Sequence, residues 1–159
     1  MATTVTAANL SVTITENVSL GNRSWGNNQI KTFTSQGEVD QRIMSIAYDS
    51  GRETGDWTDI IYLDTVDDRG QVVAANFGYF RITNLDDTNY IVLQLYMSAA
   101  KSLYFKVEAG ESFVLMSPDA DALCEAGIPT LADIARIRAV ADTAAVDIEY
   151  LVVTTGAAV

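Results

Sequence analysis

The stretch YFRITNLDDTNYIVLQLYM, residues 79–97, decides the fold class of this chain. Residues 79–83 and 90–97 are rich in β-branched and aromatic side chains, which favour strands. Residues 84–89 between them are a polar run of Asn, Asp and Thr together with one Leu, which is typical of a turn. The pattern predicts two antiparallel strands joined as a hairpin.

The rest of the chain is equally rich in strand-forming residues. Val, Ile and Thr make up 43 of the 159 residues. Residues 10–15 alternate apolar and hydroxyl side chains, which predicts a strand with one face buried. Residues 132–141 fit both helical spacing and alternation, and we favour a strand that forms a closing hairpin with 146–153. Further strands are expected at 30–34, 38–48, 60–63, 72–75, 103–107 and 112–116, with a loop at 20–28 and hairpin turns at 67–70 and 108–111.

Short strands separated by Gly, Asp and Asn turns, with no sustained helix, predict an all-β fold. We expect a single-domain antiparallel β-sandwich of jelly-roll-like form, because 159 residues fill one hydrophobic core. At most one short helix is expected, near residues 119–126. Residues 1–9 are expected to form a flexible N-terminal arm, and residues 10–159 the sandwich domain.

Composition excludes several classes of function. The chain carries 10 Lys and Arg against 21 Asp and Glu, a net charge of −11, which argues against nucleic-acid binding. It has no His, so Ser-His-Asp catalysis and His-ligated zinc are excluded. Its single Cys124 cannot form an intrachain disulfide. We expect neither a signal peptide nor a membrane span, because no long apolar run is present.

No motif predicts a catalytic, cofactor-binding or metal-binding residue. The carboxylate pairs at 67–68 and 86–87 could in principle serve acid–base chemistry, but both lie in expected turns, where Asp caps its own backbone. Residues 119–123 begin like a calcium loop, yet Leu123 takes the place of the third oxygen ligand, so we reject that site. A looser calcium site at 64–68 stays open.

Two tryptophans, Trp25 and Trp57, each lie beside a polar loop. Such a residue can contact another protein chain, stack on a sugar ring or pack in the core, and we treat both as possible interface residues. No basic residue lies between Lys106 and Arg136, although six acidic residues do. This interval is either a solvated acidic rim or a footprint for a basic partner.

Residues 80–95, FRITNLDDTNYIVLQL, and 105–115, FKVEAGESFVL, with the final DIEYLV strand at 147–152, resemble the small β-sandwich virion proteins of tailed bacteriophages. The resemblance is strongest to capsid decoration (cement) proteins and covers about half of the chain. It implies a jelly-roll-like sandwich that self-assembles as a homotrimer and docks on the major capsid protein. It also implies synthesis in the bacterial host cytoplasm and a place on the capsid exterior, and it transfers no catalytic residue.

We therefore expect a non-enzymatic virion structural protein that decorates and stabilises a capsid, with no cofactor and no nucleic-acid or membrane partner. A tail, baseplate or fibre subunit is the alternative within the structural class. The alternative from another class is a carbohydrate-binding module, in which Trp25 or Trp57 would stack on a sugar ring.

Overall fold

The computed structural model describes residues 8–48, 57–64, 71–98, 101–116 and 134–155. The chain divides into two compact units, one made of Met1–Glu38 with Thr155–Val159 and the other of Val39–Thr154. Strand β4 (Asn28–Ile46) contributes residues to both, because the division falls between residues 38 and 39.

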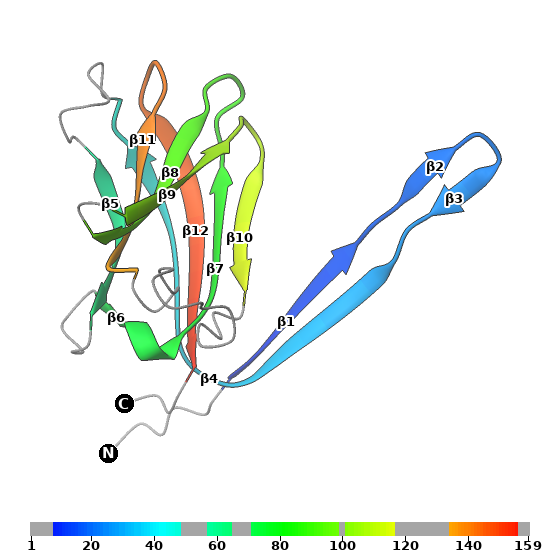
Figure 1. Ribbon diagram of the computed structural model, residues 1–159, viewed down its shortest axis with the longest axis horizontal. Coiled ribbons are helices and arrows are strands. Elements are labelled where there is room, and N and C mark those ends of the chain that lie inside the picture. The colour runs from blue at the N-terminus through cyan, green and yellow to red at the C-terminus, as the bar shows by residue number, and fades with distance from the viewer. Residues whose placement is uncertain (1–7, 49–56, 65–70, 99–100, 117–133, 156–159) are drawn as a thin grey trace. The chain divides into compact units, whose positions relative to one another are not determined.

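The unit Val39–Thr154 is a β-sandwich, so the predicted all-β fold class is confirmed (Figure 1). One sheet has the strand order β1-β4-β12-β7-β10, in which β1 (Ala8–Thr15) belongs to the first unit, and the other has the order β6-β5-β11-β8-β9. A short 3-10 helix, Ala74–Asn76, connects β6 to β7. The strands of this unit besides β4 are β5 (Thr58–Asp64), β6 (Gln71–Val73), β7 (Phe77–Asn84), β8 (Ile91–Ser98), β9 (Lys101–Val107), β10 (Ser112–Met116), β11 (Arg136–Ala141) and β12 (Val146–Thr155).

Strand pairing in the sandwich is nested. The first long strand β4 lies beside the last strand β12, β5 pairs with β11, β7 with β10, and β8 with β9. Strands β12 and β7, and likewise β11 and β8, then complete the two sheets by antiparallel pairing. Consecutive strands therefore change sheet at most connections, and the β8–β9 pair is the exception among these eight strands.

The strands were predicted in nearly the right places, but the predicted hairpins are wrong. The deciding stretch 79–97 contains β7 and β8, which lie in different sheets. β9 and β10, on either side of residues 108–111, also lie in different sheets. So do β11 and β12, which were predicted to form the closing hairpin. The expected hairpin around 67–70 fails differently, because β5 and β6 pair in parallel. Short connections of this length join opposite sheets as readily as neighbouring strands.

Several other sequence predictions are corrected, confirmed or not covered by the described residues. The strands expected at 30–34 and 38–48 are parts of one strand, β4. The ambiguous segment 132–141 is a strand from Arg136 onward, as favoured. The short helix near 119–126, the rejected calcium loop at 119–123, Cys124, Asp67, Asp68 and residues 1–7 of the expected arm lie outside the described residues. Strand β1 (Ala8–Thr15) begins at Ala8.

The core lies between the two sheets and is built from aliphatic and aromatic side chains of both. Phe80, Ile82 and Ile148 from one sheet and Leu93 and Ile137 from the other are fully buried. These residues belong to one continuous hydrophobic cluster. A single shared core holds the two sheets together, because each strand turns alternate side chains inward.

A buried asparagine orders the connection between β7 and β8. The Asn84 side chain donates to the carbonyl oxygens of Asn89 at 2.8 Å and Val107 at 3.2 Å, and it accepts a bond from the Asp86 backbone N–H at 2.9 Å. Asn84 is fully buried. These three hydrogen bonds link the connection between β7 and β8 to the end of β9. Because they satisfy the polar atoms of Asn84, this side chain can be buried in the core.

Candidate functional site

Residues 10–33 form one continuous two-stranded ribbon (Figure 1). Strand β1 pairs with β4 up to Thr15 and Asn28, and β2 (Val18–Leu20) pairs with β3 (Arg23–Trp25) in the same register. The Glu16 N–H donates to the Asn27 carbonyl at 2.8 Å and joins the two ladders. The expected loop at 20–28 is therefore wrong, since most of it is paired strand.

The register sorts the side chains of the ribbon into two unlike faces. Residues directly opposite each other in an antiparallel pair share a face, and the face alternates at each step. One face is rich in Ser, Thr and Asn, with Ile30 as its one large apolar side chain among residues 11–32. We call the other the apolar ribbon face; it carries Leu10, Val12, Ile14, Val18, Leu20, Trp25 and Phe33, together with Glu16, Arg23, Asn27, Gln29 and Lys31.

The apolar ribbon face is exposed from Ile14 to the tip, whereas Leu10, Val12 and Phe33 are half-buried. Leu20 is 72% exposed, Val18 57%, Trp25 49% and Ile14 43%. The alternation at residues 10–15 had predicted a buried face, and this is wrong for Ile14. A two-stranded ribbon by itself is only marginally stable in water, and exposed apolar surface of this kind makes the face a candidate interaction site.

Two glycines fix the shape of the ribbon near its tip. Gly21 has φ of +60° and occupies the two-residue turn between Leu20 and Arg23, where the hairpin geometry needs a left-handed residue. Gly26 allows a close approach, because a Cβ added there would lie 2.0 Å from the carbonyl oxygen of Glu16. A larger residue at Gly26 needs a shift of the backbone, whereas a larger residue at Gly21 has space around it but is strained by the left-handed φ.

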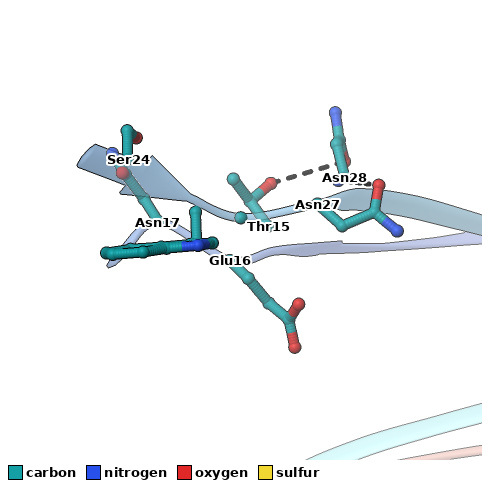
Figure 2. A pocket seen from close by; sticks show the side chains of 8 residues that line it. Thr15, Glu16, Asn17, Ser24, Asn27 and Asn28 are labelled. Carbon is teal, nitrogen blue, oxygen red and sulfur yellow. Dashed lines mark hydrogen bonds between the residues drawn. The ribbon is translucent and has the colours of Figure 1, made fainter. Parts of the chain in front are cut away.

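An open hollow of about 340 Å³ lies beside the tip, lined by residues 15–17 and 24–28. Figure 2 shows the Thr15 hydroxyl turned toward the Asn28 side-chain oxygen, 3.5 Å away, while Glu16 extends to the other side of the ribbon. The residues that line the hollow therefore offer amide and hydroxyl groups together with Trp25. It can receive a side chain or a small polar group from a partner.

The second tryptophan lies on a different surface, the outer face of the sheet β6-β5-β11-β8-β9. On β11, Arg136 lies between Tyr62 of β5 and Tyr96 of β8. Two residues further along β11, Arg138 lies between Asp59 of β5 and Gln94 of β8. Tyr104 of β9 lies on the far side of Gln94. Alternate residues of the same strands, such as Ile137 and Leu95, turn into the core. We call the outward group the aromatic–arginine face; it consists of Trp57, Tyr62, Tyr96, Tyr104, Arg136 and Arg138.

The arginines of this face are held by aromatic rings. The Arg138 guanidinium lies 4.6 Å from the ring centre of Tyr96 and 5.2 Å from that of Trp57. The Arg136 guanidinium lies 5.1 Å from Tyr62 and 5.9 Å from Tyr96. Such cation–π contacts contribute on the order of 0.5–2 kcal/mol each, depending on their exposure. The side chains therefore form one connected row rather than independent surface residues.

Hydrogen bonds add to this order. Arg138 donates through Nε to the Gln94 amide oxygen, and the Gln94 amide donates to the Tyr104 hydroxyl at 2.9 Å. The Tyr62 hydroxyl donates to Asp59, and this bond and the nearby negative charge raise the pKa of Tyr62. Arg136 is 3.8 Å from the same Asp59 carboxylate. Among the described residues, Asp59 is the one carboxylate within 4 Å of either arginine.

The described carboxylates give no arrangement for acid–base catalysis. Asp86 accepts the backbone N–H groups of Asn89 and Thr88, each at 2.7 Å, and these bonds lower the pKa of Asp86. The predicted capping of the backbone is thus confirmed for Asp86, whereas Asp87 accepts a bond from the Thr88 hydroxyl at 3.0 Å. No group of three potential metal-ligating side chains occurs within the described part of the chain. Nor do the described residues include a helix long and apolar enough to cross a membrane.

The sequence indicated both tryptophans as possible interface residues, but it did not predict which residues lie around them. Trp25 lies in the unit that holds the ribbon and Trp57 in the sandwich. The apolar ribbon face could have been found from the period-two pattern, which runs from residue 10 to residue 20 with a break at Glu16 and ends at a Gly-Asn pair suited to a two-residue turn. Arg136 and Arg138 carried no such signal, because their neighbours come from β5, β8 and β9.

Comparisons of the chain with protein-family models, curated proteins and solved structures found no match.

Proposed function

We propose that this protein is a non-enzymatic structural subunit of a tailed-phage virion. It decorates and stabilises the capsid exterior by binding other copies of itself and the major capsid protein. The observation that carries this proposal is the apolar ribbon face, which is amphipathic in register and exposed in the single chain.

The ribbon gains stability from a partner. Four large apolar side chains between 43% and 72% exposed lie on one face, three on one strand and Trp25 opposite Val18 on the other. Full burial of one such side chain is worth about 1.5–3 kcal/mol. A two-stranded ribbon is marginally stable by itself, and it becomes stable when another element packs against its apolar face. Assembly therefore supplies the layer that the single chain lacks.

A second copy of this chain suits the charges on the apolar ribbon face. Glu16 lies on this face between Arg23 and Lys31 along the register. A symmetric contact between two ribbons can place the carboxylate of one opposite a cation of the other, so the face is complementary to itself. The net charge of −11 is tolerated on an outer virion surface and disfavours a position against the genome.

The strand order supports the same proposal. Eight described strands of the sandwich pair in nested fashion, first with last, which favours the jelly-roll form implied by the resemblance to decoration proteins. We propose a homotrimer, in which each ribbon adds one contact and the lattice multiplies the effect of weak contacts. A tail, baseplate or fibre subunit would use the same ribbon, and immunogold labelling of virions distinguishes head from tail.

The test is a pair of double variants on the two faces of the ribbon. Val18→Thr with Trp25→Thr removes the apolar side chains but keeps strand propensity. Ser19→Thr with Ser24→Thr changes the directly neighbouring pair on the opposite face. Sedimentation velocity measures the oligomeric state, and co-sedimentation measures binding to capsids that lack the protein.

We expect the first variant to become monomeric and to lose capsid binding, with the melting temperature of the sandwich unchanged. The second variant should assemble like the unaltered protein. The proposal fails if the unaltered protein is monomeric and does not bind such capsids.

A further inference from the structure

We propose that the aromatic–arginine face of the sandwich binds an oligosaccharide that carries a carboxylate. This inference goes beyond the structural role, since it concerns Trp57 and its neighbours and makes no use of the ribbon. Three observations carry it: the unmatched positive charge of the face, the fixed position of its donors, and its size.

The first observation is charge. Two guanidinium groups lie on the face, and Asp59 is the one carboxylate near them among the described residues, 3.8 Å from Arg136. That carboxylate also accepts a bond from Tyr62. Arg138 has no carboxylate within 4 Å in the described part of the chain. Among the described residues, this face thus carries two guanidinium groups against one carboxylate, a surplus that an anionic ligand would match.

The second observation is that the Arg138 guanidinium is already held in place without a ligand. The Nε atom of Arg138 is engaged by Gln94, which is 97% buried, and its guanidinium is flanked by the rings of Tyr96 and Trp57. No described residue accepts a hydrogen bond from the terminal nitrogens of Arg138. A guanidinium held in this way can bind a carboxylate with two donors without first losing side-chain freedom.

The third observation is the kind and size of surface. Tyr104 is 59% exposed and Tyr62 39% exposed, so aromatic surface is available for the C–H groups of a sugar ring. Strands about 4.8 Å apart make the four-strand face about 14 Å wide, which gives on the order of 200–300 Å². Each partner of a standard protein complex buries roughly 800 Å². The face is therefore small for a protein partner and suits two or three sugar rings.

The experiment is isothermal titration of the full chain with defined saccharides. Trigalacturonate and sialyllactose are the acidic probes, and neutral maltotriose is the matched control ligand. Arg138→Gln removes the unmatched charge and Tyr104→Ala removes the exposed ring. Arg42→Gln is the matched control protein, because Arg42 is an exposed arginine on β4, in the other sheet, and pairs with Asp40.

We expect at least one acidic probe to bind about tenfold or more tightly than maltotriose, the scale of one charge-assisted hydrogen bond. Arg138→Gln should lose about that factor and Tyr104→Ala a similar one, with circular dichroism showing that each variant is folded, while Arg42→Gln binds normally. The proposal is overturned if neither acidic probe binds, if maltotriose binds equally well, or if Arg138→Gln has no effect. It is also overturned if a tetraglutamate peptide displaces the saccharide equally well, because the face would then suit an acidic protein.

Discussion

Replacing Asn84 by Ala should destabilise the sandwich strongly, although the change is small in volume. The side chain makes three hydrogen bonds, two donated to the carbonyl oxygens of Asn89 and Val107 and one accepted from the Asp86 N–H. Three lost bonds at about 1 kcal/mol each, together with the desolvation of the buried Val107 carbonyl, give about 3–5 kcal/mol. This is a large part of the stability of an ordinary domain.

Urea denaturation followed by far-UV circular dichroism measures the effect. Asp87→Ala in the same turn is the control, because its side chain is exposed and its removal should change the free energy of unfolding by less than about 0.5 kcal/mol. If Asn84→Ala lost less than about 1 kcal/mol, or no more than Asp87→Ala, the three bonds would not hold the crossing between the sheets, and our account of this connection would be refuted.

Three further outcomes are expected. Gly26→Ala should disturb the ribbon tip and weaken self-association, because the added Cβ would lie 2.0 Å from the Glu16 carbonyl oxygen; the urea midpoint of the sandwich should stay the same. The pKa of Asp86 is lowered in the folded protein, so the ionised carboxylate stabilises the fold at pH values above the ordinary pKa of 3.8. This stabilisation is lost as the pH falls through the lower pKa of the folded state. Asp86→Asn should therefore flatten the acid limb of a stability–pH curve. Burial and a hydrogen bond to Asp40 raise the pKa of Tyr150 to about 12, so the unfolded chain ionises first and stability falls between about pH 10 and 12. Tyr150→Phe should remove the last step of a spectrophotometric tyrosine titration, and an unchanged curve would contradict this assignment.

The strands could be predicted from the sequence because their signal is local. The alternation and β-branching of residues 79–83 and 90–97 identify β7 and β8 directly. Which strands pair could not be predicted in this way, because a six-residue polar connection joins either two neighbouring strands or two opposed sheets. The difference lies in distant partners, such as β12 for β7 and β11 for β8, which no local pattern identifies.

The two candidate surfaces show the same limit. Trp25 and Trp57 were identified as possible interface residues from their setting beside polar loops, but the sequence did not predict what surrounds them. Trp25 belongs to an exposed face because the ribbon has only two strands, so burial cannot be judged from alternation alone. Trp57 belongs to a row that crosses four strands, and its contact with Arg138 depends entirely on tertiary pairing.

The nested pairing also sets the order in which the chain can fold during synthesis. The strand β4 leaves the ribosome long before β12, its partner in the sheet, and β5 likewise waits for β11. Non-local pairing of this kind slows folding, because a long stretch of chain must be closed before the contacts form. The ribbon pairs only nearby residues, so it can form early, while the growing chain still carries unpaired strand edges that chaperones would need to protect.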